Sequence, residues 1–458
     1  MKPGISQHEH RRRRRALLEA IGPGAALIIP AASEVTRNRD VQYPFRQNSD
    51  FLWLTGFPEP YAIAVLVPKH KDGDYVLFVR PRDPERETWD GRRYGTEGAI
   101  EHFHAKAAHP LSEIDAKLPE LLASRRRLYY PLAQNDAFDL RVMCWLRTAR
   151  AQARKGISAP VELVDSGELL HPQRLRKRPP ELALMRKAAQ LSAHAHRQLM
   201  INCRPGLTEQ QLEALFLRHC AEQGAREQAY PPIVAGGANA CILHYVENSA
   251  RLRDGDLVLI DAGGEYQGYA ADITRTFPVN GRFSPAQREL YELVLEAQQA
   301  AIAKARPGEH WESLHQAAVR VLTRGLLRLG LLTGAEQNLK SLIKDEAYKP
   351  FYMHRTGHWL GLDVHDVGDY KVKDRWRPFE PGMTLTVEPG LYVAPEAEVP
   401  PAYRGIGIRI EDDLLITDDQ PEILSRDVPK HPDEIETLMA ETHTNAAPST
   451  RREHNARV

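Results

Sequence analysis

The chain is poor in cysteine, with four in 458 residues and no CxxC pair. Such sparse use is typical of a protein kept in reducing surroundings. We expect the four cysteines to pack as small apolar side chains in the core; they are Cys144, Cys203, Cys220 and Cys241. No run of about eighteen apolar residues occurs, and the N-terminus lacks the pattern of a signal peptide. We therefore expect a cytoplasmic protein that does not associate with membranes.

An excess of charge of either sign is also missing, since 61 lysines and arginines face 61 acidic residues. This balance offers no electrostatic reason to expect nucleic acid or an anionic membrane as a partner. The one conspicuous basic run spans residues 11–15, and it fits either a basic patch or a solvated first helix. We favour the helix, because helix-forming residues follow the run and Gly22 and Gly24 supply a stop. The tail at 441–458 has few apolar residues and is predicted to be disordered.

Two domains are expected from the length of the chain. Between residues 25 and 165, short β-rich runs alternate with helical stretches, which is typical of a small α/β domain. A basic, proline-bearing stretch at 171–182 follows, and Pro179 fits the first turn of a long helix. We place an amino-terminal domain at 1–172 and a second domain at 173–440.

The second domain contains a faint internal repeat. An Arg-Pro-Gly turn at 204–206 and another at 306–308 each precede an amphipathic helix. In each half, a strand led by a glycine then ends in a carboxylate, and a return strand carries another. These acids are Asp261 and Asp272 in the first half, and Glu388 and Glu411 in the second. The second half is longer, and we assign much of its histidine-rich stretch at 354–366 to an insertion.

The four repeated acids raise an electrostatic problem. The strand that ends at Asp261 is otherwise apolar, so its carboxylate is expected to be buried and to need a partner. A turn centred on Tyr266 and Gln267 would set Asp272 opposite Asp261. Alternation along the last strand aligns Arg409 with Glu411 on one face. Each acid alone could cap a turn or form an ordinary salt bridge, but together they favour two bound divalent cations. With a histidine added, this oxygen-rich set suits manganese best, with cobalt or zinc possible.

Four segments resemble the metal-binding motifs of the pita-bread metallopeptidases: DAGGEYQGYAADITRTF, HRTGHWLGLDVHD, LTVEPGLYV and RGIGIRIEDD. In addition, YPFRQNSDFLWLTGFPEP at 43–60 resembles the amino-terminal region of bacterial aminopeptidase P. The resemblance covers nearly the whole chain except the tail. It implies an α/β (α+β) protein, in which a small amino-terminal α/β domain precedes a pita-bread domain with a pseudo-two-fold duplication.

The resemblance also implies roles for individual residues. The implied metal ligands are Asp261, Asp272, His358, Glu388 and Glu411. The residues implied to line the substrate site are His244, His354, His365 and Arg409. One departure from the family is Arg355, where relatives commonly have glycine, and this leaves the shape of that turn open.

The expected activity is hydrolysis of the first peptide bond of substrates with proline in second place. Water bridging two divalent ions loses a proton near neutral pH, and the resulting hydroxide would attack the carbonyl carbon. Glu388 would pass a proton to the departing nitrogen, while His365 and His244 would assist as catalytic residues. Asp261 would lie near the substrate's α-amine. The preference for proline comes from the family resemblance.

Three other functions are alternatives for this sequence. A prolidase would share both domains and all five ligands but would cleave only Xaa-Pro dipeptides. A non-catalytic pita-bread module that binds partners, or a metal-free hydrolase resembling creatinase, would not need the full ligand set. Relatives often form dimers or tetramers, so we expect a homodimer or homotetramer. Trp89 could then border a neighbouring subunit's site, or it could be a core residue that anchors the surface.

Overall fold

The structure is a computed structural model that describes residues 4–443. The chain divides into two compact units, Met1–Arg174 and Leu175–Val458. Of the tail predicted to be disordered, residues 441–443 instead end a helix, and residues 444–458 lie outside the described residues. Among the described helices, none has both the length and the apolar character needed to cross a bilayer.

The amino-terminal unit is built on a six-stranded mixed sheet in the order β6-β5-β4-β1-β7-β8. Its strands are β1 (Ala25–Pro30), β4 (Ile63–Leu66), β5 (Tyr75–Val79), β6 (Ala107–Pro110), β7 (Arg127–Tyr130) and β8 (Glu162–Asp165), with a separate hairpin of β2 (Thr36–Asn38) and β3 (Val41–Gln42). Its helices are α1 (Gln7–Ile21), α2 (Ser49–Thr55), α3 (Pro84–Asp90), α4 (Gly95–Phe103), α5 (Ile114–Leu121), α6 (Asp136–Arg150) and α7 (Gly167–Leu175). The apolar runs expected to form strands lie at the centre of the sheet, because both of its faces are covered by helices and buried side chains.

The basic run lies in α1, which begins after its N-cap Ser6 and ends at Gly22. The expectation of a fully solvated helix is wrong for Arg13 and Arg14, which are buried. The guanidinium of Arg13 lies over the ring of Trp53 and donates to its carbonyl oxygen. These arginines can be buried because carbonyl oxygens and aromatic faces replace water around a weakly hydrated cation.

The expectations for cysteine and for Trp89 also need correction. Cys203 and Cys220 are buried, but Cys241 is half-buried and Cys144 is exposed on α6. Cys144 lies on the solvent-facing side of an amphipathic helix, and composition alone does not predict this exposure. Trp89 on α3 is 84% exposed, so it is not a core residue.

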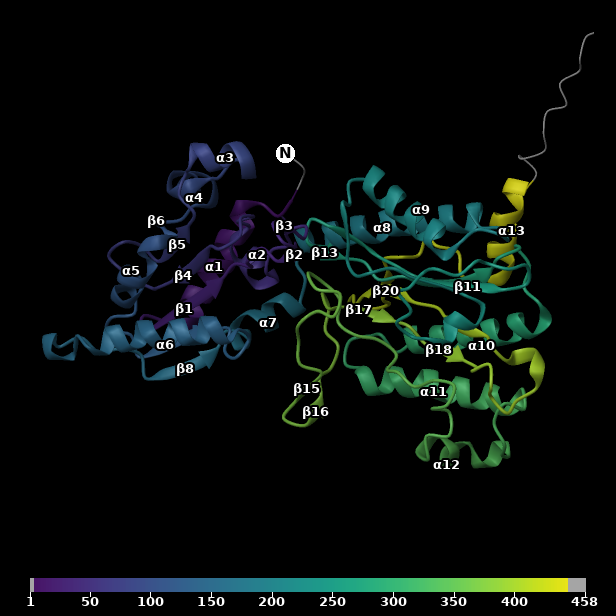
Figure 1. Ribbon diagram of the computed structural model, residues 1–458. Coiled ribbons are helices and arrows are strands. Elements are labelled where there is room, and N and C mark those ends of the chain that lie inside the picture. Colours follow the sequence, from purple (N-terminus) through teal and green to yellow (C-terminus); the bar gives the residue numbers. More distant parts are fainter. Residues whose placement is uncertain (1–3, 444–458) are drawn as a thin grey trace, which may run out of the picture. The chain divides into compact units, whose positions relative to one another are not determined.

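The second unit places helix pairs on both sides of short strands (Figure 1). Its helices are α8 (Pro179–Asn202), α9 (Glu209–Glu222), α10 (Pro285–Ile302), α11 (Trp311–Arg328), α12 (Leu339–Lys344) and α13 (Pro432–His443). Its strands are β9 (Glu227–Gln228), β10 (Ile233–Gly236), β11 (Leu257–Asp261), β12 (Gly264–Tyr266), β13 (Tyr269–Ala270), β14 (Thr274–Pro278), β15 (Lys371–Val372), β16 (Arg375–Trp376), β17 (Thr384–Val387), β18 (Gly390–Tyr392), β19 (Gly407–Arg409), β20 (Asp412–Leu415) and β21 (Glu422–Ile423). As predicted, α8 begins at Pro179, and a capping box of Thr208 and Gln211 starts α9.

The internal duplication is visible in the order of these elements. In the first half, α8 and α9 precede β11, which pairs antiparallel with β14. In the second half, α10 and α11 precede β17, which pairs antiparallel with β20. The halves meet where the backbone N–H of Glu411 donates to the carbonyl oxygen of Thr274. Each half therefore brings its acids to the same central region.

The turn of the first hairpin lies one residue later than predicted, which shifts the strand register by two residues. Its turn is centred on Gln267 and Gly268, so Asp261 lies opposite Thr274 rather than opposite Asp272. Both turn residues have positive φ, 53° and 87°. A two-residue turn of this kind favours glycine in second place, and Gly268 therefore sets the register.

Candidate metal centre

The histidine-rich stretch is held against β17 by backbone hydrogen bonds. The N–H of Thr386 donates to the carbonyl oxygen of His358, and the N–H of Glu388 donates to that of Thr356. Gly357 permits this approach, since a Cβ there would lie 2.1 Å from the carbonyl oxygen of Thr386. The pairing places His358 and Glu388 side by side, with 3.7 Å between Nε2 and Oε1.

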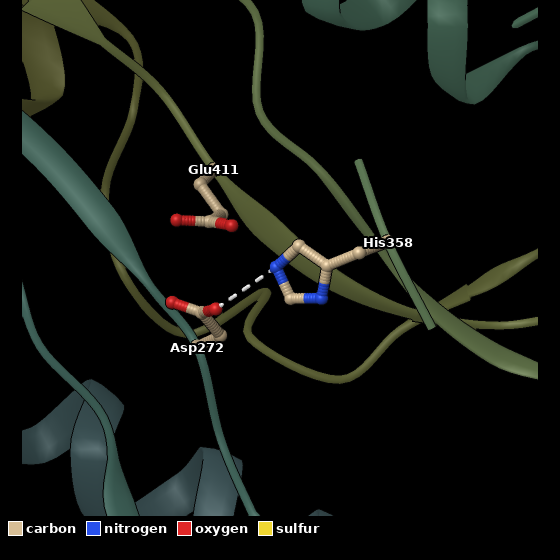
Figure 2. A group of neighbouring side chains, drawn as sticks. All are labelled: Asp272, His358 and Glu411. Atoms are coloured by element: carbon tan, nitrogen blue, oxygen red, sulfur yellow. Dashed lines mark ion pairs between the residues drawn. The ribbon is translucent and has the colours of Figure 1, made fainter. Parts of the chain in front are cut away.

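Three potential ligands from distant parts of the chain converge on one space (Figure 2). Asp272 comes from the first half, Glu411 from the second, and His358 from the inserted stretch. One ligand atom of each lies within 4.8 Å of those of the other two. The Nε2 of His358 is 3.3 Å from Oδ2 of Asp272.

His358 is oriented for ligation through Nε2. Its Nδ1 lies 2.9 Å from the carbonyl oxygen of Trp359, an acceptor that keeps a proton on Nδ1, so Nε2 is the nitrogen that could bind a cation on losing its own proton. Burial alone would lower the pKa of His358, but the hydrogen bond to Asp272 and the charges of Asp272 and Glu388 raise it to about 9. The same negative surroundings would attract a cation.

Glu411 has a buried carboxylate that protein groups satisfy only in part. Its Oε2 accepts a hydrogen bond of 2.7 Å from the Thr274 hydroxyl. Its Oε1 is buried and has no hydrogen-bond partner among the described residues. Burial, together with the charges of Asp272 and Glu388, raises the pKa of Glu411 well above its ordinary value. Because an unpartnered buried carboxylate oxygen is costly, this atom fits a bound cation.

Hydrogen bonds from Tyr230 and Arg409 complete the acidic cluster. The hydroxyl oxygen of Tyr230 lies 2.6 Å from Oδ1 of Asp261 and 2.5 Å from Oδ1 of Asp272, so one proton serves two carboxylates. Arg409 donates to Oδ2 of Asp261 at 2.6 Å and to the hydroxyl of Tyr392 at 2.9 Å. Burial raises the pKa of Asp261, against the opposing charge of Arg409. One arginine cannot neutralise four acids.

All nine site residues named from the sequence line one cavity of about 580 Å³. They are Asp261, Asp272, His358, Glu388, Glu411, His244, His354, His365 and Arg409. Apolar side chains also line it, namely Ile233, Leu243, Val246 and Val364. The cavity therefore combines a wall of acids with an apolar surface, as a site for a small peptide requires.

The three histidines beside the cluster differ in exposure. His244 and His365 are exposed, and the rings of His365 and His358 have centroids 4.3 Å apart. His354 is half-buried, and its Nε2 lies 2.9 Å from the hydroxyl of Tyr392. Burial lowers the pKa of His354 to about 3 and also lowers that of His365. Both are therefore neutral near neutral pH and able to donate one hydrogen bond.

The structure shows the shape of the turn at Arg355, which the sequence left open. The Nδ1 of His354 lies 2.7 Å from the carbonyl oxygen of Arg355. The Arg355 side chain donates to Glu312 and lies over the ring of Trp376. The arginine therefore points to a neighbouring helix and hairpin, and His358 lies beside β17.

Sequence reasoning missed several groups that support the cluster. Tyr230 and Tyr392 were not found, because nothing in their spacing distinguishes them from core tyrosines. Asp413 accepts hydrogen bonds from the backbone N–H of Asp272 and holds that segment in place. Its only signal was its position in the EDD run, two residues after Glu411.

Comparisons with known proteins agree with this geometry. Residues 183–418 match the model of Metallopeptidase family M24, and residues 10–129 match that of the Aminopeptidase P, N-terminal domain. The chain is 48% identical to the Xaa-Pro aminopeptidase of Escherichia coli over 436 residues, covering 95% of this chain and 98% of the relative. It is 36% identical to human Xaa-Pro aminopeptidase 3, covering 96% and 87% of the two chains.

A solved structure gives the same result for the fold. The Pseudomonas aeruginosa aminopeptidase PepP is similar with a TM-score of 0.94 and 53% identity, over 96% of this chain and all of that one. The duplicated fold and its cluster of acids and histidine define a metal-dependent peptidase of the pita-bread class. Within that class, the chain belongs to the aminopeptidase P family of M24 metallopeptidases. Members of this family are enzymes that use divalent metal ions.

Proposed function

We propose that the protein is an Xaa-Pro aminopeptidase, which releases the first residue of peptides with proline in second place. The observation that carries the proposal is the buried Oε1 of Glu411, which has no partner among the described residues. This oxygen lies among acids whose negative charge Arg409 and one histidine cannot neutralise. Relatives that match along nearly the whole chain bear the name Xaa-Pro aminopeptidase, which favours this activity over that of a prolidase.

Two divalent cations would be held by Asp261, Asp272, His358, Glu388 and Glu411. Carboxylate oxygens with one imidazole suit manganese best, while cobalt and zinc are also compatible. A zinc-substituted aminopeptidase P from Escherichia coli, 48% identical to this chain, shows that a relative accepts zinc. When bound, the cations would neutralise the acids and make a water molecule acidic enough to supply hydroxide near neutral pH.

The chain's own residues would then orient the substrate and move one proton. The free α-amine would pair with Asp261, which limits cleavage to the first residue. His365 and His244 would donate hydrogen bonds towards the first carbonyl oxygen, with the neutral ring of His354 beside them. Glu388 would accept a proton at a carboxylate oxygen and deliver it to the leaving nitrogen. This delivery is essential in an Xaa-Pro bond, because the ring nitrogen carries no hydrogen.

Tripeptides test the activity against the prolidase alternative. The purified protein with manganese should release the first residue from Xaa-Pro-Yaa and leave Xaa-Ala-Yaa almost untouched. Metal analysis should find two divalent ions per chain, and chelation should abolish the activity until manganese is restored. Cleavage of Xaa-Pro dipeptides alone would show a prolidase, and a metal-free protein that cleaves neither would exclude both enzymes.

We also propose a cytoplasmic homodimer or homotetramer in which Trp89 borders a neighbouring subunit's site. The support is an indole that is 84% exposed on a short helix, since large exposed aromatic side chains are common at interfaces. Sedimentation measures the assembly. The Trp89→Ala variant should raise KM for longer peptides while leaving the metal content unchanged.

A further inference from the structure

A second cavity lies within the amino-terminal unit, remote in sequence from the acidic cluster. It has a volume of about 490 Å³ and is lined by α1, by the connection from β4 to β5 and by the connection from α4 to β6. This size is in the range of small-molecule sites. The activity proposed above makes no use of it.

The arginine run supplies one wall of this cavity through helical periodicity. Arg11, Arg14 and Arg15 line it, whereas Arg12 and Arg13 do not. Spacings of three and four residues put the three lining arginines on one face of α1. Leu18, Glu19 and Gly22 continue the same stripe. Arg12 instead binds Glu9, and Arg13 binds the carbonyl oxygen of Trp53. The run thus divides between a core face and a cavity face.

Positive charge dominates the lining. Lys69 and Lys106 join the three arginines, against two carboxylates, Glu19 and Asp74. Within the described part of the chain, Glu19 forms an ion pair with Arg15 alone, and both side chains are more than half exposed, so that pair is weak and free to open. Among residues 4–443, the charged ends of Arg11, Lys69 and Lys106 form no ion pair or hydrogen bond. The carbonyl end of α1 opposes an anion, but its half charge is small beside five cations.

Two of the side chains that line the cavity are buried. Arg14 is 3% exposed, and its guanidinium lies 4.1 Å from the ring centroid of Tyr75 and donates to the carbonyl oxygens of Leu54 and Phe103. Tyr75 is also 3% exposed. These two side chains therefore give the cavity a fixed wall beside its exposed cations.

We propose that this cavity binds the diphosphate group of a small metabolite. The cations come from three separate segments, so they can reach several oxygens from different directions. A carboxylate offers two oxygens, whereas a diphosphate offers more and matches the planar fork of arginine. Leu18, Pro23 and Pro68 provide an apolar wall for the rest of the ligand. This inference does not depend on the proposed peptidase activity.

Calorimetric titration of the full-length protein tests the proposal with pyrophosphate, ADP, adenosine and citrate as probes. Pyrophosphate and ADP should bind, before and after chelation of metals, and binding should weaken steeply with salt. The double variant Arg11→Gln/Arg15→Gln should weaken binding by roughly tenfold or more. Arg12→Gln, which removes one positive charge from the same helix outside the cavity, should have almost no effect.

The two phosphate probes separate the possible sources of the ligand. Equal affinities would indicate inorganic diphosphate, and a clear preference for ADP would indicate a nucleoside diphosphate. The proposal is overturned if neither probe binds at about 1 mM, if citrate binds equally well, or if the arginine double variant binds like the parent. Circular dichroism checks its folding, and Lys69→Gln, on an exposed connection, provides a second test if that variant does not fold.

Discussion

Glu411 combines a structural cost with a role in metal binding. It is 1% exposed, one oxygen is bonded to Thr274, and the other is without a partner among the described residues. The nearby charges of Asp272 and Glu388 oppose its ionisation. A residue kept only for stability would not be placed in this way. Its effect on stability should therefore change sign with metal.

The Glu411→Gln variant tests this reversal. In chelated protein it should be more stable than the parent by roughly 1–2 kcal/mol, because a buried like charge is removed. With manganese present it should be less stable than the parent, and activity should fall by a factor on the order of 100 or more. Urea unfolding with and without metal measures both effects. Glu398→Gln, an exposed acid, should show neither, and a variant that is destabilised equally in both conditions would contradict the metal role.

Also at the scale of single residues, the sequence predicted the acids of the site better than the residues that hydrogen-bond to them. Asp261 and Glu388 stand out because Asp261 ends an apolar strand and Glu388 directly follows β17, and burial of a charge demands an explanation. Tyr230 does not stand out, since its contact with two carboxylates depends on how three distant segments meet. Similarly, Arg13 and Arg14 look solvated in a basic run until the tertiary structure brings aromatic rings to them.

The segment 354–366 is the element on which the site most depends, and a buried ion pair anchors it. The Nζ of Lys177 lies 2.8 Å from Oδ2 of Asp366, and both side chains are 1% exposed. The N–H of Asp366 also donates to the carbonyl oxygen of Trp359, which closes the loop between His358 and His365. The ion pair thus connects the residues just before α8 to the loop that presents both histidines.

Breaking that pair should affect both stability and catalysis. The Lys177→Met variant removes the ammonium group from beside a buried carboxylate and should cost roughly 3–5 kcal/mol. It should also weaken metal binding, because His358 and His365 lose a fixed loop. Adding Asp366→Asn should recover much of the stability. Urea unfolding and metal titration measure these effects.

A neighbouring pair provides the control for this experiment. Arg176→Met removes an exposed contact with Glu380 and should change stability by less than about 0.5 kcal/mol. Equal losses in Lys177→Met and Arg176→Met would show that the buried pair has no special role. So would a double variant no more stable than Lys177→Met.

Element boundaries were predictable where local chemistry sets them, and less so where tertiary contacts do. Pro179 marks the start of α8 correctly, because its fixed φ suits a first turn. The hairpin turn was misplaced by one residue because strand alternation cannot locate a turn, whereas Gly268, with its positive φ, can. The pairing of residues 356–360 with β17 could not be read from any periodicity.

At the scale of the whole molecule, the two units should respond to different variables. The second unit holds the acidic cluster and should respond to metal. The amino-terminal unit holds His10, which is 4% exposed, with Nδ1 2.9 Å from the carbonyl oxygen of Trp53. Burial and the nearby charge of Arg13 lower the pKa of His10 to about 3. The folded unit therefore keeps this ring neutral where an unfolded chain would protonate it.

The sign of the resulting pH dependence follows from proton linkage. Below a pH of about 6.5 the unfolded chain binds a proton that the folded unit does not bind until about pH 3. The stabilising contribution is complete above the upper value and declines as pH falls, by up to about 1.4 kcal/mol per pH unit. The His10→Asn variant keeps an N–H donor and removes this proton, so its stability should fall less steeply between these values.

Hydrogen exchange, measured at the same pH in the parent and in His10→Asn, separates the effect on the amino-terminal unit from that on the second unit. Protection of α1 and β1 in the parent, relative to His10→Asn, should decrease between about pH 6 and pH 4.5. Protection of β11 and β17 should show no such difference and should instead decrease on chelation in both proteins. His8→Asn, which replaces an exposed histidine on the same helix, should behave like the parent. A parent and a His10→Asn variant with parallel pH profiles would mean that the buried ring does not control the acid stability of this unit.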